Sequence, residues 1–152
     1  MHVNVSPAPK HPGPKVADVG FPARLRMTLL KLSRSLRAQR SDALPDGQHA
    51  VLATVVALGP MTPGELAERE HVTPPSMTRT VQSLVDAGLV ERTAHPDDRR
   101  QALIAPTDTG VALVRETRRR RDLWLSKRLA TLTPQERATL AEAEKILRRL
   151  YN

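Results

Sequence analysis

Small hydroxyl side chains and one guanidinium are concentrated over residues 73–79. Thr73, Ser76 and Thr78 offer hydroxyls, and Arg79 offers a planar fork of N–H donors. Apolar residues recur beside them at helical spacing, and these are Met77, Val81, Leu84 and Val85. The polar groups therefore lie wholly or partly off the apolar stripe of one helix. Such groups can bond base edges and phosphates, and the positive helix end favours a nearby anionic backbone.

A charged turn, residues 95–100, is the second candidate surface. It separates two expected strands, 89–94 and 101–105, and reads His-Pro-Asp-Asp-Arg-Arg. Asp98 and Arg100 stand two residues apart on this turn, so we expect the carboxylate to brace one guanidinium while Arg99 stays free. A braced arginine at a loop tip suits a narrow minor groove, where the negative potential is enhanced. Charged turns are common at protein surfaces, so this one indicates DNA binding only in combination with the helices before it.

Two capped helices must position these side chains. Thr62 and Glu65 form the spacing of a capping box for a short helix that ends near residue 70. After a tight turn at residues 71–72, Thr73 caps a second helix that begins with two prolines and stops at Gly88.

Neither helix buries much alone, but Leu66 and Ala67 can pack against the apolar stripe of the second helix. The pattern predicts a helix-turn-helix followed by a wing. The residues that we expect to contact double-stranded DNA are Thr62, Thr73, Pro75, Ser76, Thr78, Arg79, Asp98, Arg99 and Arg100.

The rest of the chain divides around this unit. Residues 1–20 are proline-rich and are expected to form a disordered tail. Residues 21–41 form a helix with leucines on one face, residues 44–107 form the winged domain, and residues 107–152 form two further helices. The apolar stripes at 25–36 and 140–150 flank the winged domain and need a partner, for which a second copy is the simplest choice. The predicted fold is mainly α with a small β-hairpin wing.

Composition narrows the classes of function. The net charge of +8 favours a polyanionic partner, although an arginine-rich composition also arises from genomic base composition. Cysteine is absent, which excludes disulfides and thiolate metal sites. No long apolar run or signal peptide is found, so we expect a cytoplasmic protein without membrane contact.

Three other functions are weighed against a DNA-binding regulator that responds to an organic ligand. An enzyme is disfavoured because the sequence has no catalytic serine, nucleotide-binding or paired-histidine motif, and no cofactor is expected. His95 with Asp97 forms a weak candidate metal site, which leaves a metal-responsive regulator open. The third alternative is a winged-helix protein-interaction module. Residues 118–121 are four consecutive arginines, and we favour their pairing with Glu116, Asp122 and the acidic residues of the last helix over long-range attraction to DNA.

These residues resemble the MarR family of bacterial transcription regulators. The correspondence covers about residues 21–152 and is specific over the stretches VTPPSMTRTVQSLVDAGLVER and HPDDRRQALIAPT. Asp98 and Arg100 match the family's Asp-x-Arg wing signature. The sequence departs from the family pattern at Pro106, where leucine is usual, and in the two prolines that open the recognition helix.

The resemblance implies a function as well as a fold. Members are homodimers joined by the helices at both chain ends, and their two winged domains read a palindrome in adjacent major grooves. They are commonly repressors released by a small, often aromatic, organic effector. By the same resemblance, the effector pocket involves the first helix, the second helix near His49 and Leu52, and the helix after Thr107.

Overall fold

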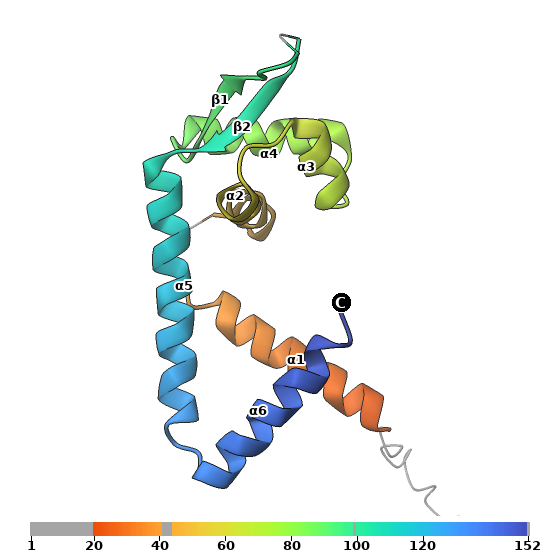
Figure 1. Ribbon diagram of the computed structural model, residues 1–152, viewed down its shortest axis with the longest axis vertical. Coiled ribbons are helices and arrows are strands. Elements are labelled where there is room, and N and C mark those ends of the chain that lie inside the picture. Colours follow the sequence, from red (N-terminus) through yellow and green to blue (C-terminus); the bar gives the residue numbers. More distant parts are fainter. Residues whose placement is uncertain (1–19, 41–43, 99, 152) are drawn as a thin grey trace, which may run out of the picture. The chain divides into compact units, whose positions relative to one another are not determined.

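The computed structural model describes residues 20–40, 44–98 and 100–151. Six helices and two strands form in this part of the chain, in the order α1, α2, α3, α4, β1, β2, α5, α6 (Figure 1). The chain divides into two compact units, Met1–Ser35 and Leu36–Asn152. The predicted tail lies outside the described residues except for Gly20, and so does Arg99 of the predicted wing.

The first unit contains most of α1, Phe21–Arg37. The helix ends earlier than the predicted residue 41, because residues 38 and 39 form a turn. None of its residues is buried. Leu29 and Leu32, which lie on the predicted apolar stripe, are each 41% exposed, so this face lacks a cover within the described chain.

The second unit has its core between α2 (Asp46–Leu58), α3 (Pro63–Arg69), α4 (Pro74–Asp86) and the hairpin. Leu66 of α3 and Met77 and Leu84 of α4 are fully buried. Leu52 and Val55 of α2 are buried with them. The predicted packing of two short helices on each other is therefore confirmed, and α2 supplies the third wall of the core.

The wing is an antiparallel pair of β1 (Val90–Ala94) and β2 (Ala102–Pro106). Each strand begins one residue later than predicted, and the register runs from Val90 opposite Pro106 to Ala94 opposite Ala102. Met61 adds a bridge to β2 through two backbone hydrogen bonds with Ile104, of 2.8 and 3.2 Å. Pro106, the departure from the family pattern, is the last residue of β2, so the wing still joins the next helix directly.

α5 (Asp108–Leu129) is fastened to the end of α4 at its first turn. The Thr107 hydroxyl donates to the Gly88 carbonyl over 2.7 Å and accepts from the Gly110 N–H over 3.1 Å. The Thr107 N–H donates to the Leu89 carbonyl over 3.1 Å. Gly110 is buried against this same carbonyl. The start of α5 and the end of α4 therefore form one hydrogen-bonded junction.

The last helix, α6 (Pro134–Arg148), begins with the predicted capping box at Thr133 and Glu136. It contains no buried residue. Leu140, Ile146 and Leu150 are 48%, 53% and 70% exposed. In α5 the buried residues lie only in the first half, at Gly110, Val114 and Thr117. No helix of the described residues is long and apolar enough to span a membrane.

Candidate nucleic-acid interface

α3 begins with a complete capping box. The Thr62 hydroxyl accepts from the Glu65 N–H over 3.2 Å, and the Glu65 carboxylate accepts from the Thr62 N–H over 2.8 Å. The Thr62 hydroxyl also donates to Glu65 Oε2 over 2.9 Å. The bond from the Thr62 N–H and then this bond from its hydroxyl lower the pKa of Glu65. The prediction of this cap is confirmed, and much of the hydrogen-bonding capacity of Thr62 is used within its own helix.

The turn between α3 and α4 is a left-handed helix stop. His71 has a φ of 53°, and its N–H donates to the Glu68 carbonyl over 3.2 Å. The next N–H, of Val72, donates to the Ala67 carbonyl over 3.0 Å. Together these bonds form a Schellman motif, which here places a histidine where glycine is usual. The motif fixes the direction in which the chain enters α4.

Thr73 is the N-cap residue of α4, but its side chain makes no cap hydrogen bond. Its expected role as a hydroxyl cap was therefore wrong. Pro74 and Pro75 occupy the first two helical positions, and proline has no N–H to donate. Ser76 stands three residues after Thr73, where a capping box has glutamate or glutamine, so the reciprocal bond is also missing. The helix starts through the fixed φ of proline instead.

The outer face of α4 carries the remaining candidate residues. Thr78 and Arg79 are exposed and Ser76 is half-buried. The Thr78 hydroxyl donates to the Pro74 carbonyl over 3.0 Å, which leaves its oxygen as an acceptor. Arg79, the next residue, is also exposed and lies beside Thr78 on the outer side of the helix. This face has the residue types that read base edges and phosphates in a major groove.

A hydrogen-bonded chain that the sequence did not reveal joins the wing to α4. Arg92 of β1 donates from Nη2 to Gln82 Oε1 over 3.1 Å. Gln82 in turn donates from Nε2 to Asp86 Oδ1 over 2.7 Å. The second pair follows ordinary helical spacing, but the first depends on where the hairpin returns along α4. It links the exposed side chains of the two elements.

Among the described residues of the wing tip, Asp98 accepts one hydrogen bond from the backbone and one from a side-chain amide. Asp98 Oδ1 accepts from the Arg100 N–H over 2.9 Å, and Asp98 Oδ2 accepts from Gln101 Nε2 over 3.0 Å. The prediction that the Arg100 guanidinium donates to Asp98 was therefore wrong, because the donor is the Arg100 backbone N–H. A carboxylate at the start of a tight turn reaches the N–H two residues ahead more directly than it reaches a long side chain. Both carboxylate oxygens of Asp98 are engaged in these bonds, and the side chain of Arg100 is exposed.

His95 is part of the same turn. Its Nδ1 accepts from the N–H groups of Asp97 and Asp98, each over 3.2 Å. His95 Nδ1 is therefore used by the backbone of the turn. Among the described residues, no group of three or more His, Asp or Glu side chains could hold a metal ion.

The arginine run of α5 pairs mainly along its own helix. Glu116 accepts from Arg119 Nε and from Arg120 Nε, each over 2.8 Å, and these bonds lower the pKa of Glu116 to about 2. Arg121 Nε donates to the Leu36 carbonyl over 3.3 Å. The expected pairing with Glu116 is confirmed. The expected pairing with acids of the last helix was wrong for Glu142 and Glu144, which bind Lys145 and Arg148 within α6.

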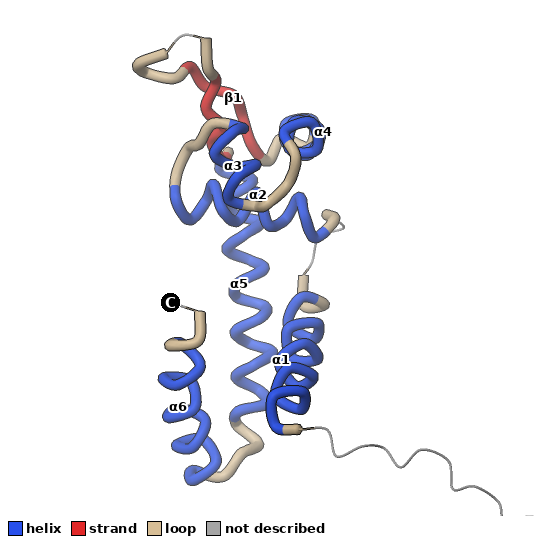
Figure 2. The backbone as a smooth tube through the Cα atoms, turned by 90° about the vertical axis from the view of Figure 1, so that its right-hand side faces the viewer, coloured by secondary structure: helices blue, strands red, loops and turns tan. Residues whose placement is uncertain are grey.

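α4 and the hairpin lie at one end of the second unit, and the hairpin projects beyond α3 and α4 (Figures 1 and 2). This is the geometry of a winged helix-turn-helix. The sequence model of the MarR family matches residues 44–102. An uncharacterised helix-turn-helix-type transcriptional regulator of Mycobacterium bovis is 42% identical over 132 residues, which cover 86% of this chain and 92% of the relative. The chain belongs to the MarR family of transcription regulators.

Solved structures agree with this assignment. RV1404 of Mycobacterium tuberculosis superposes with a TM-score of 0.77 at 27% identity, covering 91% of this chain and 99% of that chain. Wild-type MarR of Escherichia coli superposes with a TM-score of 0.69, also at 27% identity, covering 88% of this chain and 98% of that chain. The predicted MarR resemblance and the winged-helix fold are therefore confirmed. Because the family and the relatives are transcription regulators, the enzyme alternative is excluded.

Proposed function

We propose that this MarR-family protein is a repressor that binds a palindromic operator as a homodimer and releases it when a small organic ligand binds. One observation carries the DNA-binding part. The polar outer face of α4 lies beside the hairpin, the bond from Arg92 to Gln82 links the two, and two prolines set the start of the helix. A helix of this kind fits a major groove while the wing reaches the neighbouring minor groove.

The unburied helices at the chain ends support the homodimer. α1 and α6 contain no buried residue, and both carry leucines on one face. A second copy would remove these apolar faces from water, and an isologous interface is the commonest arrangement of soluble oligomers. Two winged domains would then present two α4 helices to half-sites one helical turn apart.

Binding to the DNA upstream of the protein's own gene tests the proposal. We expect specific binding by fluorescence anisotropy to a site whose half-sites are centred about 10 base pairs apart. If a dimer neutralises about eight phosphates, log K falls with log salt with a slope of about −7. Equal affinity for operator and random DNA, with a slope near zero, would leave the protein-interaction module as the better reading.

Light scattering tests the dimer separately. Leu140→Asp places a charge on the apolar face of α6 and should shift the protein from dimer to monomer or make it insoluble. Ala138→Asp is the matched control, because its position lies on the other side of α6 by helical spacing and is also exposed. If the Leu140→Asp variant is as stable a dimer as the Ala138→Asp variant, the assignment of this face is refuted.

A further inference from the structure

His95 opens the turn between β1 and β2 and is half-buried, whereas Pro96 and Asp97 beside it are exposed. Its Nδ1 accepts hydrogen bonds from the N–H groups of Asp97 and Asp98, each over 3.2 Å. Its own N–H donates to the Gln101 carbonyl over 3.3 Å, which closes the turn. The imidazole therefore takes the place that an aspartate or asparagine side chain has in an Asx turn.

The rest of the turn depends on this first side-chain acceptor. Asp98, whose N–H binds His95, accepts in turn from the Arg100 N–H over 2.9 Å and from Gln101 Nε2 over 3.0 Å. The Gln101 N–H donates to the Asp98 carbonyl over 3.0 Å. The bond to His95 therefore helps to fix Asp98, and through Asp98 it helps to fix the backbone that carries Arg100.

The two bonds at His95 require a neutral imidazole. An imidazole nitrogen accepts a hydrogen bond only while it carries no proton, and in the neutral ring the proton is then on Nε2. Protonation turns Nδ1 into a donor that faces two further donors, the N–H groups of Asp97 and Asp98. Histidine is the side chain that ordinarily changes its charge between pH 5 and 8. The bonds that shape the turn are therefore lost when the ring becomes charged.

The charged groups near His95 come from α3 and from its own turn, whereas β2 brings the uncharged Gln101. The bonds with Thr62 and, after them, the charge of His95 lower the pKa of Glu65, so the ring and the start of α3 are within electrostatic reach. The charged residues of the turn itself are Asp97, Asp98, Arg99 and Arg100. Carboxylates thus outnumber guanidiniums by three to two, and they offset a positive charge on the ring. The lost hydrogen bonds, rather than the added charge, are then the main effect of protonation.

We propose that His95 makes the wing sensitive to pH, with the turn ordered while the imidazole is neutral and loosened once the ring is protonated. The order of the turn is a property of the protein alone. Its effect on DNA rests on the proposed function, because a loosened turn no longer holds Arg100 in place for the minor groove. Operator affinity therefore falls as the pH drops from about 7.5 to about 5.5.

Nuclear magnetic resonance of the full-length protein tests the turn without DNA. At about pH 7.5 the nitrogen-15 shifts of the His95 ring should show the proton on Nε2, and relaxation measurements should show ordered amides at Asp97 and Asp98. At about pH 5.5 these two amides should lose that order, in step with the titration of the ring. A proton on Nδ1 at the higher pH, or amides that stay equally ordered at the lower pH, would overturn the proposal.

Two substitutions separate His95 from other titrating groups. His95→Asn keeps an acceptor oxygen close to the position of Nδ1, and this oxygen does not titrate, so the turn should stay ordered at both pH values. His71→Asn is the matched control, because it removes a histidine from the turn between α3 and α4, where asparagine tolerates the φ of 53°. The His71→Asn variant should respond to pH as the wild type does. The reverse result, a response in His95→Asn and none in His71→Asn, would assign the effect to the wrong histidine and refute the proposal.

Fluorescence anisotropy at about 0.15 M salt, where exposed charges are screened, measures the consequence for operator binding. The wild type and His71→Asn should bind the operator at least about threefold more weakly at the lower pH, and His95→Asn should bind it equally at both. Equal pH dependence in all three proteins would show that His95 does not control the wing. If no operator is bound at either pH while the turn responds as described, the proposed function fails and the proposal for the turn stands.

Discussion

Gly110→Ala is the substitution that most directly tests the junction between α4 and α5. A Cβ atom at this position would lie 2.1 Å from the Leu89 carbonyl oxygen and 3.0 Å from Leu52 Cδ1. The first distance is about 1.3 Å short of the 3.4 Å at which ordinary contact begins. Because the obstacle is backbone, either the first turn of α5 or the start of β1 must move.

Two effects of opposite sign decide the magnitude. Alanine favours a helix over glycine by about 1 kcal/mol. Overpacking of a closed core costs about 1–3 kcal/mol and sometimes more, and displacement of Leu89 also strains the bond from the Thr107 N–H, which is worth about 1 kcal/mol. The gain and the strained bond nearly cancel, so we expect the free energy of unfolding to fall by about 1–3 kcal/mol.

Urea unfolding followed by far-ultraviolet circular dichroism, at one fixed protein concentration, measures this change. Gly47→Ala is the matched control, because Gly47 also lies in the first turn of a helix and a Cβ there would meet nothing within 4 Å. That variant should be as stable as the wild type or up to about 1 kcal/mol more stable. If Gly110→Ala proves as stable as Gly47→Ala, the close packing of the junction is wrong.

Three further outcomes are expected. Thr62→Ala should lower the free energy of unfolding by about 1 kcal/mol and Thr73→Ala by only a few tenths, because only Thr62 makes cap hydrogen bonds; equal losses in urea titrations would contradict this. The Arg119 and Arg120 bonds lower the pKa of Glu116 from 4.5 to about 2, so its carboxylate stabilises the fold above about pH 4.5 and loses that effect as the pH falls toward 2. Glu116→Gln should therefore be less stable than the wild type near neutral pH, and a gap that stays constant down to pH 2 in acid titrations would count against the pairing. Arg79→Ala should weaken operator binding by about 1–3 kcal/mol and random DNA less, whereas Arg100→Ala should weaken both and most at AT-rich flanks; equal, flank-independent losses in anisotropy titrations would show that the division of roles is wrong.

Much of the fold follows from short-range patterns in the sequence. Capping residues and glycine stops act within one turn of a helix, so the boxes at Thr62 and Thr133 and the left-handed stop at Gly88 were predictable. The apolar stripe of α4 also fixed which residues face the core. Strand limits shifted by one residue because pairing with Met61 and the position of Thr107 set the register.

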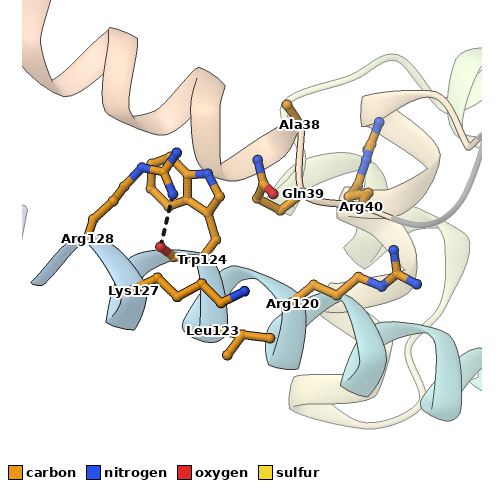
Figure 3. A pocket seen from close by; sticks show the side chains of 8 residues that line it. All are labelled: Ala38, Gln39, Arg40, Arg120, Leu123, Trp124, Lys127 and Arg128. Atoms are coloured by element: carbon orange, nitrogen blue, oxygen red, sulfur yellow. Dashed lines mark hydrogen bonds between the residues drawn. The ribbon is translucent and has the colours of Figure 1, made fainter. Parts of the chain in front are cut away.

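The wing and its attachment were harder to predict. The partner of Asp98 depends on the exact turn geometry, and the sequence offers both a backbone N–H and a guanidinium within reach. The bond from Arg92 to Gln82 joins residues ten positions apart on two elements, and no periodicity encodes that approach. A hollow lined by residues 38–40 and by the second half of α5 (Figure 3) has the same origin, because it forms only when that segment lies against α5.

The two prolines at the start of α4 have a consequence for how its binding preference can change. Helix starts usually offer several backbone N–H groups to anions, and those groups are the same whatever the residue. Pro74 and Pro75 remove two of them, so the donors left at this end are mostly side chains. Free phosphate or other cellular anions then find a weaker competing site. If α4 reads DNA as proposed, its preference for one sequence is carried by side chains, which mutation can exchange. Point mutation of positions 73, 76, 78 and 79 can thus alter that preference while the helix start stays the same.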